Sequence, residues 1–149
     1  MSIQKIVSGG QTGVDRAALD AALERGVPIG GWCPRGRRAE DGQLAARYPL
    51  QETPAADYAQ RTAWNVRDSD GTLILVAGAP AGGTALTVEE ARRRKKPFLQ
   101  ADIEANGVDR IRAWIRQHDI GVLNVAGPRA SESSGIYEAA YALMMRVLD

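Results

Sequence analysis

Strand-like and helix-like patterns alternate along the whole chain. Short apolar runs predict strands at residues 3–7, 27–32, 72–76, 97–101 and 122–125. Apolar residues at helical spacing predict helices at residues 14–25, 58–68, 84–95, 108–118 and 136–148, the second of them with Asp57 as its N-cap. Regular alternation of this kind is typical of a parallel sheet covered by helices. We therefore expect an α/β fold with a doubly wound, mainly parallel sheet flanked by helices.

Length and composition restrict the class of protein. The 149 residues, 44% of them hydrophobic, can bury one core but are few for two, so we expect a single ligand-binding domain over residues 1–149. A net charge of +1 gives no overall positive field of the kind that nucleic-acid-binding proteins use. The chain has no apolar run of about 18 residues, and its start lacks the apolar core of a signal peptide. We expect a cytoplasmic protein that binds neither nucleic acid nor membrane.

Three glycine-bearing turns, at residues 8–13, 77–84 and 126–131, each join a predicted strand to a predicted helix. In a parallel sheet such turns share one edge, where backbone N–H groups and helix N-termini face an incoming anion. The turns therefore predict one crevice for a small anionic ligand. Its candidate binding residues are Gly9, Gly10, Gln11, Thr12, Gly13, Gly82, Gly83, Thr84, Gly127, Arg129 and Ser131.

Nearby arginines extend this candidate site. Arg16 lies on the first predicted helix, and Arg35 and Arg38 lie in residues 33–54, where periodicity is absent and a loop that covers the crevice is expected. A guanidinium group suits phosphate, and an ordinary surface charge is the alternative for each arginine. With one cysteine, Cys33, and one histidine, His118, we expect no disulfide and no metal held by protein ligands.

Two common nucleotide-binding motifs are missing. The glycines do not follow the G-x-G-x-x-G spacing of dinucleotide-binding folds, which disfavours NAD. No Gly-Lys-Ser/Thr follows them either, which disfavours ATP-driven phosphoryl transfer.

Four ordered segments carry a resemblance to a known family: SGGQTGVDRA (8–17), GWCPRGRRAEDG (31–42), GGTALT (82–87) and NVAGPRAS (124–131). The chain resembles the molybdenum cofactor carrier family, which is similar to the Rossmann-like lysine-decarboxylase-like or "lonely guy" nucleotide-processing enzymes. The resemblance implies a Rossmann-like fold, homo-oligomers and reversible binding of the molybdenum cofactor (molybdopterin), with molybdoenzymes or cofactor-synthesis proteins as partners. Gln43, Ala45 and Ser134 stand where that family commonly has proline.

One position separates a carrier from an enzyme. The related enzymes have a catalytic glutamate three residues after their glycine-threonine pair, and this chain has Thr87 there. A hydroxyl cannot replace a carboxylate that accepts a proton. We therefore expect a carrier that binds a phosphate-bearing pterin or nucleotide-like ligand without conversion and has no catalytic residue. The alternatives are a phosphoribohydrolase-type enzyme that uses Asp15, Glu89 or Glu90, and a nucleotide-sensing module.

The closing predicted helix, at residues 136–148, has apolar side chains over more than one narrow stripe. One sheet face would cover only part of that surface, so the pattern indicates a homo-oligomer. The alternative is a helix that is buried deeply within its own domain.

Overall fold

A sheet of parallel strands forms the centre of the fold in the computed structural model, which describes residues 3–78, 82–103 and 107–149. Within these residues the sheet has five strands, in the order β2-β1-β9-β7-β8. Their bounds are β1 Lys5–Val7, β2 Ile29–Gly30, β7 Gly71–Val76, β8 Phe98–Asp102 and β9 Val122–Ala126. All the pairings within this sheet are parallel. The predicted fold class is confirmed.

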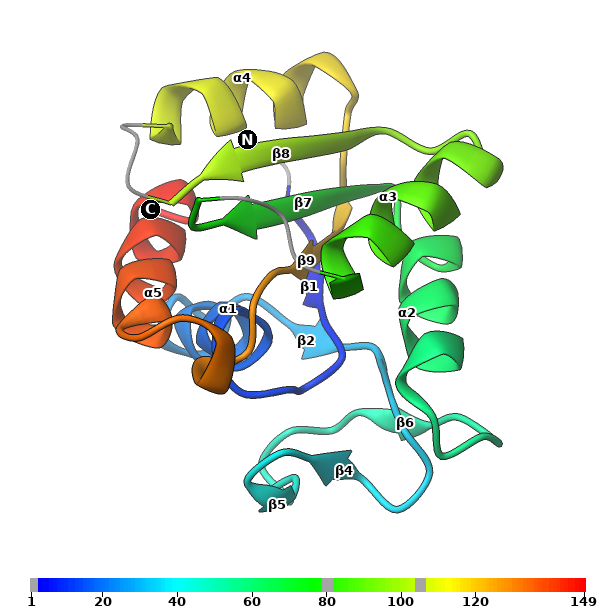
Figure 1. The fold of residues 1–149 in the computed structure, drawn as a ribbon. Coiled ribbons are helices and arrows are strands. Elements are labelled where there is room, and N and C mark those ends of the chain that lie inside the picture. The colour runs from blue at the N-terminus through cyan, green and yellow to red at the C-terminus, as the bar shows by residue number, and fades with distance from the viewer. Residues whose placement is uncertain (1–2, 79–81, 104–106) are drawn as a thin grey trace.

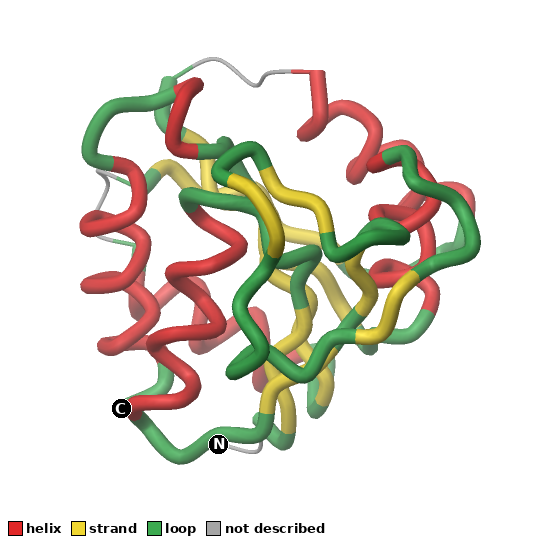
Figure 2. The backbone as a smooth tube through the Cα atoms, turned by 90° about the horizontal axis from the view of Figure 1, so that it is seen from below, coloured by secondary structure: helices red, strands yellow, loops and turns green. Residues whose placement is uncertain are grey.

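Helices cover both faces of the sheet (Figures 1 and 2). On one face lie α1 (Val14–Glu24), α4 (Val108–Gln117) and α5 (Ile136–Val147), with α5 packed against both others. On the other face α2 (Tyr58–Arg67) packs against α3 (Gly82–Arg93). The chain crosses from β1 to β2 and from β7 to β8 in opposite directions along the sheet. Because such crossovers are right-handed, their helices lie on opposite faces.

The helices and strands predicted from the sequence agree with these elements to within a few residues. Asp57 is the N-cap of α2, where its side chain accepts a hydrogen bond from the Gln60 N–H at 3.1 Å. In β7, Leu73, Ile74 and Leu75 are fully buried, as a strand covered on both faces requires. None of the helices in the described part of the chain has the length and apolar character needed to cross a lipid bilayer.

Residues 34–56, which we call the lobe, differ from the expected aperiodic loop. Short strands run through it: β4 (Arg38–Ala39) pairs with β5 (Gly42–Gln43), and β6 (Gln51–Glu52) pairs with β3 (Trp32–Cys33). Figure 1 shows β4, β5 and β6 below the main sheet. Strands of two residues are too short to leave a periodic pattern in the sequence.

Side chains hold the lobe in place from within. Leu44, Tyr48 and Leu50 are buried with Leu19 and Cys33 in a second hydrophobic cluster. The Arg37 guanidinium donates hydrogen bonds to the backbone carbonyls of Leu44, Ala45, Tyr48 and Leu50. The expected loop therefore contains short two-residue strands, and buried side chains with one arginine hold its irregular parts in place.

The closing helix, α5, is largely covered within the chain. Five of its apolar side chains are buried in the main core: Ile136, Ala140, Leu143, Met144 and Val147. Contacts with α1 and α4 thus account for much of the apolar surface that indicated an oligomer. The homo-oligomer stays a prediction, and the broad apolar surface of α5 no longer supports it.

Candidate functional site

The first and third glycine turns lie against each other at the carboxyl edge of the sheet. A Cβ atom added to Gly13 would lie 2.4 Å from the carbonyl oxygen of Pro128, so only glycine permits this approach. The Thr12 hydroxyl accepts a hydrogen bond from the Ala130 N–H at 3.1 Å and joins the same two turns. Residues 79–81 of the second turn lie outside the described residues, but its last residues border the cavity described next.

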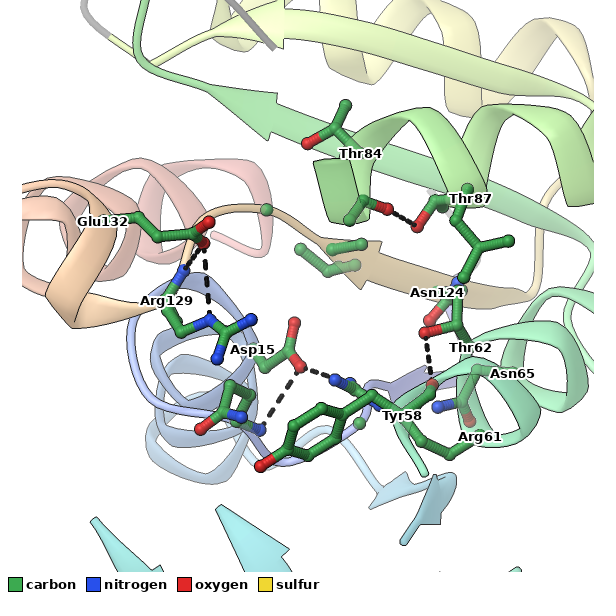
Figure 3. A pocket seen from close by; sticks show the side chains of 17 residues that line it. Asp15, Tyr58, Arg61, Thr62, Asn65, Thr84, Thr87, Asn124, Arg129 and Glu132 are labelled. Carbon is green, nitrogen blue, oxygen red and sulfur yellow. Dashed lines mark hydrogen bonds and ion pairs between the residues drawn. The ribbon is translucent and has the colours of Figure 1, made fainter. Parts of the chain in front are cut away.

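A cavity of about 120 Å³ lies where the turns meet, and Figure 3 shows its lining. The first turn and α1 contribute Gly9, Gln11 and Asp15, and α2 contributes Tyr58, Arg61, Thr62 and Asn65. The start of α3 contributes Gly83, Thr84, Leu86 and Thr87, and β9 with the following turn contributes Asn124, Val125, Ala126, Gly127, Arg129 and Glu132. Six of the predicted binding residues line the cavity: Gly9, Gln11, Gly83, Thr84, Gly127 and Arg129.

A buried ion pair forms one wall of the cavity. Asp15 Oδ2 accepts hydrogen bonds from Arg61 Nη1 at 2.9 Å and from the Gln11 N–H at 3.2 Å. Burial raises the pKa of the Asp15 carboxyl, and the charge of Arg61 opposes that rise. A Cβ atom on Gly9 would lie 1.6 Å from Arg61 Nη1, so the guanidinium can reach Asp15 only across a glycine. Arg61 is not predictable from the sequence, because no local pattern indicates a partner 46 residues away.

Arginines gather around one aromatic ring at the same place. The guanidinium carbons of Arg38, Arg61 and Arg129 lie 4.9, 5.2 and 5.7 Å from the ring centre of Tyr58. Such distances allow favourable cation–π contact. Arg129 also lies 3.6 Å from the Glu132 carboxylate. The structure thus brings predicted Arg38 and Arg129 together beside the cavity, from the lobe and from the third turn.

Gln11 carries a buried hydrogen-bond donor for which the described residues supply no acceptor. Its Oε1 accepts from the Thr12 N–H at 3.0 Å and from the Glu40 N–H at 2.8 Å. Its Nε2 has no partner within the described residues, and neither do the Nε atoms of Arg61 and Arg16. A buried polar atom without a partner costs about 1–3 kcal/mol, and such atoms are uncommon in folded proteins.

Three predicted binding residues instead contact acidic residues of the lobe. Glu40 accepts hydrogen bonds from the Thr12 hydroxyl, from the Ser131 hydroxyl at 2.6 Å and from the Ser131 N–H at 3.1 Å. Asp41 forms an ion pair of 2.6 Å with Arg16. Hydrogen bonds from Ser131 and Thr12 lower the pKa of Glu40, and the bond from Arg16 lowers that of Asp41. These donors are therefore engaged by protein carboxylates, and their residues do not line the cavity.

The remaining predicted residues also lie away from the cavity lining. Gly10 faces the second hydrophobic cluster, because an added Cβ would lie 2.9 Å from Leu44 Cδ2. Gly13 packs against the third turn, Gly82 begins α3, and Arg35 is exposed. Their roles in ligand binding stay predictions.

The acids named for the enzyme alternative occupy different places. Glu89 is exposed, and Glu90 forms ion pairs with Arg93 at 2.7 Å and Arg94 at 3.2 Å. Neither lines the cavity, whereas Asp15 does. The Thr87 hydroxyl donates to the Gly83 carbonyl at 3.0 Å within α3.

Comparisons with known proteins give two findings. The model of a family described as "Circularly permutated YpsA SLOG family" matches residues 6–148. A crystal structure from Syntrophus aciditrophicus, described as a "putative molybdenum carrier protein", has 47% sequence identity and a TM-score of 0.94, and the match covers 99% of this chain and 96% of that one. No curated protein matches the chain.

Proposed function

Because the chain belongs to the circularly permutated YpsA SLOG family, we propose that its cavity binds a phosphate-bearing pterin or nucleotide-like ligand and releases it unchanged. The molybdenum cofactor is the ligand that the sequence resemblance implies. The description of the similar Syntrophus aciditrophicus protein as a "putative molybdenum carrier protein" supports that choice.

One observation carries the proposal: cationic side chains and a helix N-terminus converge on a single cavity. Arg61 and Arg129 line it, and Gly83 and Thr84 lie in the first turn of α3 beside it. Guanidinium groups and the free N–H groups of a helix N-terminus are the groups that proteins use to bind phosphate. Among the described residues of the lining, Asp15 and Glu132 contribute carboxylates, and each forms an ion pair with one of the two arginines.

The lining also fits what the molybdenum cofactor requires of a protein. The cofactor's dithiolene sulfurs hold the metal, so the protein has to supply charge for the phosphate and hydrogen bonds for the pterin. Thr84 and Asn124 provide uncharged polar groups in the same cavity as the arginines. Asn124 is held in place by a hydrogen bond from its Nδ2 to the Thr72 hydroxyl at 3.2 Å.

Phosphate binding tests the proposal. Inorganic phosphate should stabilise the protein against heat, by about 2.7 kcal/mol when its concentration reaches 100 times the dissociation constant. Arg129→Ala should remove most of this stabilisation, whereas Arg110→Ala, an exposed arginine on α4, should leave it unchanged. Equal stabilisation of both variants would place the phosphate site elsewhere. As a separate experiment, native mass spectrometry of protein purified from its own host identifies the bound ligand by its mass.

Asp15 supports a second candidate, an enzyme of the phosphoribohydrolase type. A buried carboxyl group with a raised pKa beside a cavity can act as a general acid or base. Common nucleoside monophosphates should nevertheless release no free base in the presence of the protein. Base release that disappears in Asp15→Asn would favour the enzyme over the carrier.

A further inference from the structure

The Gln11 side chain is held in one orientation by its neighbours. Two backbone N–H groups, from Thr12 and Glu40, donate to its Oε1. If the amide turned over, both donors would face an NH₂ group and both hydrogen bonds would be lost. The positions of Oε1 and Nε2 are therefore fixed, with Nε2 as the donor. The backbone N–H of Glu40, a residue of the lobe, helps to fix them.

The residue that carries this donor lines the proposed ligand site. Gln11 is only 5% exposed, it lines the cavity, and its Nε2 finds no acceptor in the described part of the chain. The Asp15 carboxylate, which also lines the cavity, is engaged by the Gln11 backbone N–H and by Arg61. Arg61, in the same lining, carries a second buried donor without a partner within the described residues, its Nε, and the Nε of Arg16, a residue outside this lining, is a third. A ligand that supplies the missing acceptor accounts for the two donors whose residues share one cavity lining.

We propose that Gln11 is a specificity-determining residue whose Nε2 donates a hydrogen bond to an acceptor oxygen of the bound ligand. The inference rests on the proposed function, because it concerns the same cavity. A phosphate group and the lactam carbonyl of a pterin both offer such an oxygen. A ligand that presents an N–H group at this position is rejected, because two donors would then face each other with no acceptor between them.

Gln11→Glu tests the donor with little change of shape. The introduced carboxylate can still accept from the Thr12 and Glu40 N–H groups, but it replaces the NH₂ donor by an oxygen. Isothermal titration calorimetry measures the affinity for two probes separately. Inorganic sulfate represents the phosphate group, and neutral pterin carries the lactam carbonyl. At about pH 7, where the pterin is neutral, we expect the variant to bind at least one probe tenfold or more weakly than the wild type. Weaker sulfate binding assigns the acceptor to the phosphate, and weaker pterin binding assigns it to the lactam.

Acidification separates a donor from a merely structural residue. A protonated carboxyl regains an O–H donor, and an ordinary glutamate carboxyl has a pKa of about 4.3. The affinity ratio between wild type and Gln11→Glu should therefore fall toward one between about pH 7 and pH 4, whereas Gln11→Met should show no recovery. Asp15, Arg61 and Glu40 are the charged groups around this position, and they are common to all three proteins. Thermal unfolding checks that each variant is folded.

The outcomes distinguish this inference from the function on which it rests. If the wild type binds a probe and Gln11→Glu and Gln11→Met bind both probes as tightly as the wild type does, the donor role is overturned and the cavity proposal survives. If Gln11→Glu loses affinity that acid does not restore, Gln11 is only structural. Wild-type protein that binds neither probe would overturn the proposed function together with the inference.

Discussion

The surroundings of the first turn, residues 8–13, differ in how the neighbouring side chains engage hydrogen-bond donors. In the lining of the cavity, Gln11 Nε2 and Arg61 Nε are buried donors without an acceptor in the described residues. Toward the lobe, the Thr12 hydroxyl and Arg16 Nη1 donate to the carboxylates of Glu40 and Asp41, and only the Nε of Arg16 lacks a partner in the described residues. Acidic residues of the lobe thus engage donors on one side, and the proposed ligand site lies on the other.

The two sides also differ in how strongly water screens their charges. The side chains of Asp15 and Arg61 are 6% and 13% exposed, whereas Asp41 is 52% exposed. Removing one partner from a buried ion pair is far more costly than removing one partner from an exposed pair. Substitutions on the cavity side should therefore have the larger effects on stability.

Arg61→Leu should have the largest effect. It leaves the Asp15 carboxylate buried without its cation, and we expect the free energy of unfolding at neutral pH to fall by about 3–5 kcal/mol in urea denaturation. Arg67→Leu is the matched control on the same helix, because Arg67 and its partner Asp68 are 41% and 46% exposed. The control should lose less than about 1 kcal/mol. Equal losses would show that burial does not distinguish the two pairs.

The pH dependence of the Arg61→Leu deficit follows from the pKa of Asp15. Burial raises that pKa in the folded protein above its unfolded value, so the folded state holds the proton more tightly and stability falls as pH rises through the interval between the two values. Loss of Arg61 raises the folded pKa further. The deficit should therefore shrink as pH falls toward the unfolded value of about 3.9, and a deficit independent of pH would contradict the ion-pair interpretation.

Arg37→Lys should have an intermediate effect, confined to the lobe. Lysine cannot reproduce the four hydrogen bonds that the Arg37 guanidinium donates to backbone carbonyls. We expect a loss of about 1.5–3 kcal/mol, with faster hydrogen exchange of amides in residues 37–50 and unchanged exchange in β7. Arg35→Lys, at an exposed arginine of the same segment, is the control. Faster exchange throughout the sheet would mean that the lobe and the sheet unfold together.

Glu40→Gln should have the smallest effect on stability. The carboxylate is exposed, so solvent screening limits the expected loss to less than about 1 kcal/mol. Because hydrogen bonds from Ser131 and Thr12 depress the folded pKa of Glu40, its contribution is present above the unfolded pKa of about 4.3 and is lost as pH falls through the folded value. The difference between wild type and variant should therefore disappear in acid. A difference that persists there would come from the shape of the side chain.

The amino-acid sequence by itself determined the order and type of the main elements, because helix and strand periodicities and caps such as Asp57 are local. It also indicated that the turns would meet, since the carboxyl ends of parallel strands share an edge. Gly9, Gln11 and Arg129 were identified in this way, and all three line the cavity.

Only the tertiary structure decided which of the predicted groups face a ligand site. The pairing of Asp15 with Arg61, the engagement of Thr12 and Ser131 by Glu40, and the organisation of the lobe by Arg37 all join segments that carry no common periodicity. Whether a donor is satisfied depends on which acceptor the folded chain brings within hydrogen-bond distance. That distance is a property of the packing, and no spacing along the sequence encodes it.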